Sequence, residues 1–194
     1  MKTKLIYGYF INPDHLFARR GKIEEVVNSL GLASVNRINP PSNSDPNKCN
    51  RMSRAHILAI ETADAKGNYP YILFEDDCLP MRGFPKEIPI PAEADLIYLG
   101  GSNYWNGELP TMTFEPFNDD YLRVKYMLSA HAILIPDANG ANLIWEAYSK
   151  AIETGGFNDI QLALASERYN FLAPKEGFYF YQSGYNEGVT KFNY

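Results

Sequence analysis

The sequence predicts a single α/β domain over residues 1–194, in which a mostly parallel, twisted sheet has helices on both faces. Short apolar segments alternate along the chain with longer segments whose apolar residues recur at helical spacing. The segment from Tyr71 to Phe74 is apolar without alternation, which is typical of a strand buried on both faces. A chain of 194 residues with 45% hydrophobic residues can bury a large core without disulfides.

Composition excludes several classes of partner. The net charge is −5 and no basic run is present, so we expect neither nucleic acid nor an anionic membrane as the main partner. Only Cys49 and Cys78 occur, which favours a reducing, cytoplasmic location, although the two could still pair. The apolar stretch from Leu5 to Ile11 is cut short by Asn12 and Pro13, so we expect no signal peptide and no membrane span. A small ligand is the expected partner.

The first half of the chain reads as a strand, a helix, a loop and a second helix. Residues Lys4 to Ile11 predict the strand, and Leu16 to Leu30 carry apolar residues at helical spacing. Residues Asn36 to Asn50 are rich in Asn, Pro and Ser and predict a loop. The second helix is predicted over Met52 to Ala63.

The second half continues this alternation after the strand that starts at Tyr71. Four prolines exclude a regular helix between Leu79 and Ala92. Two strands are predicted next, at Ala94 to Leu99 and at Tyr126 to Ile135 with His131 in its middle, and a loop at Asn103 to Tyr121 separates them. A helix from Pro136 to Ile152 and a helix with Asp159 in its first turn follow. The chain ends in a predicted loop from Lys175 to Tyr194.

Three consecutive carboxylates, Glu75, Asp76 and Asp77, follow the buried strand. In extended backbone Glu75 and Asp77 would point one way and Asp76 the other. Buried, unpaired carboxylates are costly or become protonated, and a divalent cation would relieve this. Oxygen ligands without a nearby Cys/His cluster suit Mg²⁺ or Mn²⁺. The alternative is a strand that ends in a solvated acidic turn.

A set of short motifs extends over most of the chain in a fixed order: Phe10-Ile11-Asn12, Arg19-Arg20, Leu30-Gly31, Cys49, Arg54-Ala55-His56, Tyr71 to Cys78, Asp95 to Gly100, His131 to Leu134 and Asp159. In their order and spacing the chain resembles the glycosyltransferases of the lipopolysaccharide-biosynthesis type (family 25), which have the Rossmann-like GT-A fold. The resemblance implies a hexosyltransferase-type enzyme that moves a sugar from a nucleotide-diphosphate donor, a UDP-sugar, to a hydroxyl of a glycan acceptor. It implies an inverting reaction, although the residues leave retention open.

The resemblance also implies roles for residues. It places Mn²⁺ or Mg²⁺ on Glu75, Asp76 and Asp77, and it places Asp159 opposite the acceptor as the catalytic base. The structural alternative is that the negative charge of Asp159 only stabilises the start of its helix by interacting with the helix dipole. The expected nucleotide-sugar-binding residues are Ile11, Asn12, Arg19, Arg20, Arg54, His56, Gly100, Gly101 and His131.

Each of these binding residues has a structural alternative. Arg19 and Arg20 could bind phosphates through bidentate bonds or lie on a solvated face. His56 lies on an apolar helix face, as core histidines do, and Ala55 stands where the family has a serine. The glycines Gly100 and Gly101 allow close approach of a ligand, or form an ordinary turn. His131 could contact the metal or diphosphate, or be buried and structural.

Two other functions remain open on the sequence. The first is a sugar-nucleotide nucleotidyltransferase, which also uses acidic residues and a metal on an α/β sheet. That class normally has a glycine-rich, basic loop after its first strand, and none is visible after Ile11. The second is a glycan- or nucleotide-binding domain without catalytic activity.

Overall fold

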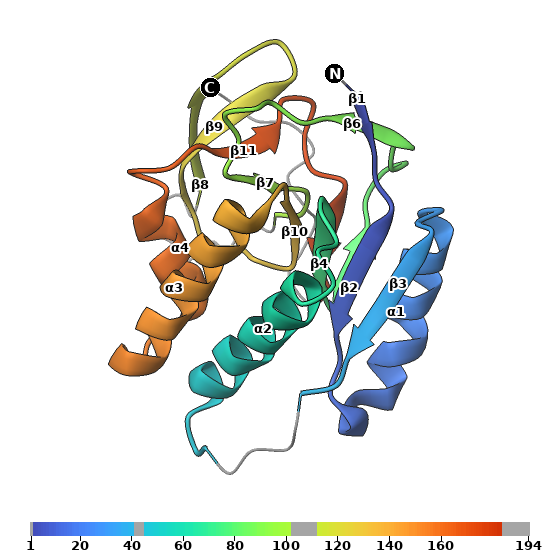
Figure 1. The fold of residues 1–194 in the computed structure, drawn as a ribbon, viewed down its shortest axis with the longest axis vertical. Coiled ribbons are helices and arrows are strands. Elements are labelled where there is room, and N and C mark those ends of the chain that lie inside the picture. The colour runs from blue at the N-terminus through green and yellow to red at the C-terminus, as the bar shows by residue number, and fades with distance from the viewer. Residues whose placement is uncertain (1, 41–44, 102–111, 184–194) are drawn as a thin grey trace.

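The structure is a computed structural model that describes residues 2–40, 45–101 and 112–183. Its centre is an eight-stranded sheet of order β3-β2-β4-β10-β7-β11-β9-β8 in this part of the chain (Figure 1). The strands are β2 (Tyr7–Ile11), β3 (Ser34–Ile38), β4 (Tyr71–Glu75), β7 (Leu96–Tyr98), β8 (Met112–Pro116), β9 (Tyr121–Met127), β10 (Ala132–Ile135) and β11 (Phe171–Pro174).

Most strands of this sheet run in one direction. The pairs β2–β3, β2–β4 and β7–β11 are parallel, whereas β10 and β9 run against their neighbours. Two small antiparallel sheets join β1 (Lys2–Lys4) to β6 (Glu87–Pro89) and β5 (Cys78–Pro80) to β12 (Phe180–Gln182). The predicted α/β fold is therefore confirmed, and the sheet is mixed: six of its eight strands run in one direction, while β9 and β10 run in the other and make four of the seven strand pairs antiparallel.

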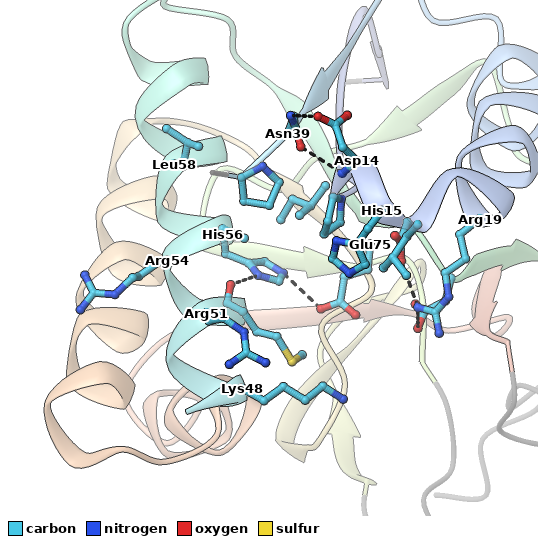
Figure 2. A pocket seen from close by; sticks show the side chains of 18 of the residues that line it. Asp14, His15, Arg19, Asn39, Lys48, Arg51, Arg54, His56, Leu58 and Glu75 are labelled. Carbon is cyan, nitrogen blue, oxygen red and sulfur yellow. Dashed lines mark hydrogen bonds and ion pairs between the residues drawn. The ribbon is translucent and has the colours of Figure 1, made fainter. Parts of the chain in front are cut away.

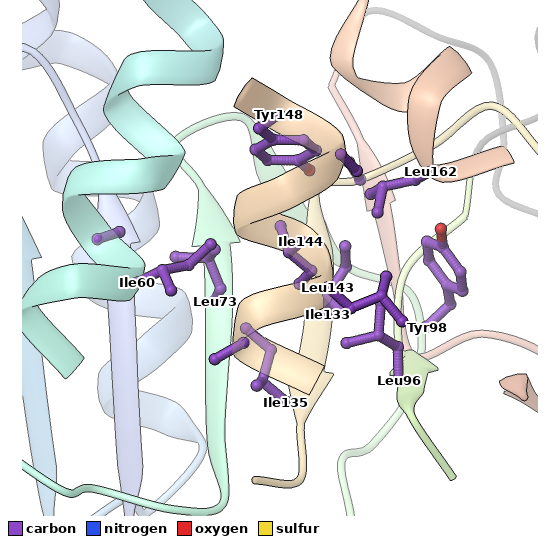
Figure 3. Close-up of a cluster of buried hydrophobic side chains, with 14 of the residues drawn as sticks. Ile60, Leu73, Leu96, Tyr98, Ile133, Ile135, Leu143, Ile144, Tyr148 and Leu162 are labelled. Carbon is purple, nitrogen blue, oxygen red and sulfur yellow. The ribbon is translucent and has the colours of Figure 1, made fainter. Parts of the chain in front are cut away.

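Helices cover both faces of the sheet. One core packs α2 (Lys48–Asp64), α3 (Ala138–Thr154) and α4 (Asn158–Ala165) against one face, through residues such as Ile60, Leu73, Ile144 and Leu162 (Figure 3). The other core packs α1 (Phe17–Ser29) against the opposite face. Side chains alternate across a strand, so neighbouring residues of β4 serve different cores: Leu73 faces α2 and Phe74 faces the α1 side.

The predicted helices lie where periodicity placed them, and their ends have local causes. The first predicted helix begins as a short 3-10 helix, η1 (Asp14–Leu16), and continues as α1. The carboxylate of Asp137 caps α3 by accepting from the backbone amides of Asn139 and Gly140. Gly155 ends α3 in the left-handed conformation, with φ 67°. Asp159 occupies the first turn of α4, as predicted.

Two predicted loops contain strands. The strand β3 lies partly inside the predicted loop 36–50, and β8 lies inside the predicted loop 103–121. Both are edge strands of the sheet, and their mostly half-exposed residues lack a strong apolar pattern. The predicted tail loop also contains a strand, β12, while residues 184–194 lie outside the described part.

The predicted strand from Tyr126 to Ile135 is two strands. The strand β9 ends at Met127 and β10 begins at Ala132, and the two lie at different places in the sheet. His131 therefore lies at the start of β10 and not in the middle of a strand. Apolar residues lie on both sides of the break between the two strands, so the hydrophobic pattern did not reveal the break.

Two further expectations concern the chain as a whole. Cys49 and Cys78 are both free thiols. None of the helices in the described ranges has the length and apolar character needed to cross a bilayer.

Candidate functional site

A cleft of about 1590 Å³ lies at the carboxyl ends of the parallel strands (Figure 2). Ile11, Ile38 and Glu75 end β2, β3 and β4 in register at this edge. Its walls come from the segment after β2, the start of α1, the N-terminal half of α2 and the turn after β4. Seven predicted site residues line it: Ile11, Arg19, Arg54, His56, Glu75, Asp76 and Asp77.

The aspartates of the acidic motif share one arginine. Arg19 donates from Nη1 to Oδ1 of Asp76 at 3.1 Å and to Oδ2 of Asp77 at 3.3 Å. The predicted alternation of side chains is wrong at this point, because β4 ends at Glu75 and the chain turns at residues 76–77. The turn brings both aspartates to the same side of the cleft.

Other residues fix these two aspartates. Asn12 is fully buried and donates from Nδ2 to Oδ2 of Asp76 at 2.8 Å. Gln182 donates from Nε2 to Oδ2 of Asp77 at 3.0 Å, and the Ser183 amide donates to the carbonyl of Asp77. The position of each carboxylate is therefore set by neighbours from distant parts of the chain.

Glu75 is engaged by a histidine. Nε2 of His56 lies 3.1 Å from Oε1 of Glu75, and Nδ1 of the same ring lies 3.0 Å from the carbonyl oxygen of Met52. Burial raises the pKa of Glu75, but the hydrogen bond and charge of His56 lower it, with the net result that the pKa is lowered. Tyr148 packs edge-on against the ring at 5.0 Å between centroids. His56 is thus both a core histidine and the partner of a cleft carboxylate.

Asp77 is the carboxylate best suited to a further cation. Burial, together with the negative charge of Glu75, raises its pKa to about 6. Its Oδ1 atom is buried and accepts no hydrogen bond from any residue that the structure describes. Buried polar atoms without partners are rare in proteins, and a bound cation is one way to satisfy them.

The donor set fits a cation held partly by the ligand. No cluster of three or more His, Cys, Asp or Glu side chains able to hold a metal occurs among residues 2–40, 45–101 and 112–183. Asp76 and Asp77 converge, whereas Glu75 faces His56. Mg²⁺ and Mn²⁺ commonly use one or two carboxylates plus the phosphates of a substrate. Two aspartates are sufficient for that mode.

Arg20 stands behind the cleft wall. It donates from Nε to Oδ1 of Asn12 at 3.3 Å and pairs with Asp14 at 3.4 Å. The Asp14 carboxylate also pairs with Arg37 at 2.6 Å and accepts from Asn39 at 2.7 Å. These hydrogen bonds lower the pKa of Asp14, that from Arg37 most strongly. Arg20 therefore orients Asn12, and through it Asp76.

Several cleft residues were not predicted from the sequence. Lys48 and Arg51 line the cleft from the same helix as Arg54, and their spacing of three residues could have revealed a shared face. Gln182 and Asn39 carried no such signal, because only the fold brings them to the site.

Gly100, Gly101 and His131 lie outside the cleft lining, although the His131 carbonyl accepts from the amide of Glu75, which does line the cleft. A Cβ atom at Gly100 would lie 2.5 Å from Nε2 of His131, and one at Gly101 would lie 2.0 Å from the ring of Phe178. Protein side chains therefore occupy the space that these glycines leave. His131 is fully buried, contacts the Ser129 hydroxyl at 2.9 Å through Nδ1, and has a pKa lowered to about 4 by burial.

Asp159 also lies outside the residues that line the cleft. Its carboxylate accepts from the backbone amide of Ile160 at 2.9 Å. Burial raises its pKa, and the negative charge of Glu75 raises it further. Glu75 is therefore close enough to affect the ionisation of Asp159.

Comparison with known proteins identifies the fold. No family model and no curated protein matches this sequence. A solved structure of a glycosyltransferase involved in the glycosylation of the major capsid of PBCV-1 is similar, with a TM-score of 0.58 and 8% identity over 93% of this chain and 94% of that chain. A UDP-glucose pyrophosphorylase complexed with UDP-glucose is similar with a TM-score of 0.52 and 10% identity, over 92% of each chain.

These similarities define a class by fold alone. The chain has the GT-A-like α/β fold of these two structures. At such low identities the fold is shared without any established activity. Membership of family 25 stays a prediction from the sequence motifs.

Proposed function

We propose that this protein is a glycosyltransferase that moves a sugar from a nucleotide-diphosphate donor, a UDP-sugar, to a hydroxyl of a glycan. The observation that carries the proposal is the pair Asp76 and Asp77, joined by Arg19, at the carboxyl end of β4 in a large cleft. Open α/β sheets bind ligands at this edge. The GT-A-like fold supports the same substrate class.

The cleft residues supply the functions that such a transfer needs. Asp76 and Asp77 would hold Mn²⁺ or Mg²⁺, with Asn12 and Gln182 fixing their orientation. When bound, the ion would stabilise negative charge on the departing diphosphate as a Lewis acid. Arg19, at the cleft, would donate hydrogen bonds to the same phosphates.

The acceptor hydroxyl must lose a proton as the new glycosidic bond forms. We assign this role to Asp159, which the resemblance places opposite the acceptor. A carboxylate with a raised pKa is a better base near neutral pH than an ordinary one, because proton transfer to it is more favourable. An inverting reaction, in which the acceptor oxygen attacks the sugar on the face opposite the departing diphosphate, needs such a base.

Nucleotidyl transfer is the second candidate, because the UDP-glucose pyrophosphorylase shares the fold. The segment after β2 argues against it. Asn12 and Pro13 lead there into the 3-10 helix η1, in place of a glycine-rich, basic loop. Glycosyl transfer is therefore the function that we favour.

The test is a thermal-shift screen of UDP-sugars with and without Mn²⁺. A ligand at about 100 times its Kd should add about 2.7 kcal/mol to the free energy of unfolding. The UDP-sugar that stabilises the protein most is then incubated with the protein and glycan acceptors, and in a separate reaction with the protein and pyrophosphate. Transfer to a glycan supports the proposal, and nucleoside triphosphate formation from pyrophosphate would replace it with the second candidate. No stabilisation by any nucleotide sugar would reject both.

A further inference from the structure

The Arg19 guanidinium occupies the space between the two aspartates. A single nitrogen, Nη1, reaches Oδ1 of Asp76 and Oδ2 of Asp77. A nitrogen at 3.1 and 3.3 Å from two carboxylates stands close to where a cation shared by both would stand. The guanidinium and such a cation therefore compete for the same oxygens.

Arg19 is the movable member of this cluster. Its side chain is 48% exposed, whereas those of Asp76 and Asp77 are 8% and 11% exposed. Asp76 is held from behind by the buried amide of Asn12, and Asp77 by Gln182. Removal of the guanidinium would leave both carboxylates in place but unneutralised. The arginine lies in the first turn of α1 and lines the same cleft.

We propose that Arg19 is a displaceable internal counter-ion, which neutralises Asp76 and Asp77 in the nucleotide-free protein and moves to the diphosphate when a nucleotide binds. The inference rests on the proposed function, because it invokes the same nucleotide and the same cation. It adds a regulatory property: the divalent cation and the nucleotide bind cooperatively, and Arg19 carries part of the coupling.

The physical basis is a competition between anions for one guanidinium. Phosphate oxygens accept parallel hydrogen bonds from arginine at least as well as carboxylates do. Once the diphosphate takes the guanidinium, the aspartates regain their affinity for a divalent cation. By thermodynamic linkage, the cation must raise the affinity for the nucleotide by the same factor.

The experiment measures Mn²⁺ binding directly, by the electron paramagnetic resonance signal of free Mn²⁺, with and without UDP. Wild type should bind Mn²⁺ more tightly when UDP is present. Arg19→Met removes the charge and keeps the aliphatic stem, so its UDP-free affinity for Mn²⁺ should rise about tenfold, the size of effect that one nearby charge has on a carboxylate. The gain caused by UDP should shrink in the same variant.

Lys150→Met is the matched control, because it removes one positive charge from a residue of α3 that pairs only with Glu153 among the described residues. It should bind Mn²⁺ as wild type does. Arg19→Gln is a second neutral variant and should move in the same direction as Arg19→Met. Circular dichroism establishes that each variant is folded.

An unchanged or weaker UDP-free affinity for Mn²⁺ in both folded Arg19 variants would overturn the inference. If wild type binds UDP and transfers sugar while the Arg19 variants show no gain, only the counter-ion role is rejected. If wild type binds neither UDP nor Mn²⁺, and the variants bind no Mn²⁺ either, the proposed function is rejected with it.

Discussion

Asp77 is largely buried and one of its two carboxylate oxygens lacks a hydrogen-bond partner among the described residues, which has a cost in stability. Its Oδ1 atom accepts no hydrogen bond from the described residues, and its pKa is raised to about 6 by burial and by the charge of Glu75. A protein selected only for stability would not keep a carboxylate in this environment. Groups of this kind concentrate at functional sites, where strain is retained for binding.

The sign of the pH effect follows from the direction of the shift. Between about pH 4 and pH 6 the unfolded chain loses the Asp77 proton while the folded protein keeps it, so rising pH lowers the free energy of unfolding. Asp77→Asn removes this term. We expect the variant to be as stable as wild type near pH 4 and more stable by roughly 1–3 kcal/mol above pH 6.

Urea unfolding across this pH range measures the effect, and Asp119→Asn, at an exposed residue, is the control, which should track wild type. The Asp77 variant should at the same time lose most Mn²⁺-dependent affinity for the nucleotide diphosphate, because a neutral amide is a poor ligand for a hard cation. Equal stability of variant and wild type at all pH values would contradict the raised pKa. Unchanged Mn²⁺-dependent affinity would contradict the metal role.

The residues of the cleft differ in how far the sequence could predict them. The acidic motif was visible because its members are contiguous and follow a buried strand. Its geometry was not, since alternation holds only while the strand continues, and β4 ends at Glu75. Gln182 could not be found at all, because its bond to Asp77 joins residues 105 positions apart. Contacts of that kind depend on the whole fold.

At the scale of elements, the helices and strands that are most buried are the ones that the sequence predicts best. The strand β4 is buried on both faces, and α3 has a wide apolar face, so both have strong patterns. The edge strands β3 and β8 need only partial burial, and their polar residues resemble those of loops. The buried strand and the apolar helix face were predictable for this reason, while the edge strands of the sheet were not.

The helix α4 places Asp159, and its role as the base can be tested on that element. Asp159→Asn keeps the side-chain shape and an oxygen that can accept from the Ile160 amide, and it removes the negative charge. If Asp159 accepts the acceptor proton, turnover should fall by roughly 10²–10⁴-fold while donor affinity barely changes. Transfer rate and donor Kd, measured side by side, decide this.

A role limited to the helix dipole gives a different result. Turnover would then stay near wild type, and the free energy of unfolding would fall by about 0.3–1 kcal/mol, because the first turn of α4 loses a negative charge. In that outcome, the search for the base moves to Glu115, Asp119 and Asp120, around the β8–β9 hairpin. A fall in donor affinity equal to the fall in turnover would instead mean that Asp159 binds the donor.

On the scale of the whole molecule, the cleft belongs to one half of the sheet. It is lined from β2, β4, α1 and α2, whereas β9 and β8 form the opposite edge (Figure 1). The elements that line the cleft pack into the two hydrophobic cores: α2 into one, α1 into the other, and β2 and β4 into both. Ligand binding should therefore suppress local openings near the cleft first, and should protect the distant β8–β9 hairpin only through the higher global stability.

Hydrogen exchange in the presence of UDP and Mn²⁺ tests this division. We expect slower exchange in η1, in the N-terminal turns of α2 and at residues 182–183, all of which line the cleft or border it. Amides of β8 and β9 that exchange through local opening should exchange as in the free protein, because none of the residues that line the cleft comes from these two strands. The same measurement with Asp77→Asn should lose the protection at the cleft. Protection concentrated on β8 and β9 would place the nucleotide at the opposite edge of the sheet and exclude the cleft as its site.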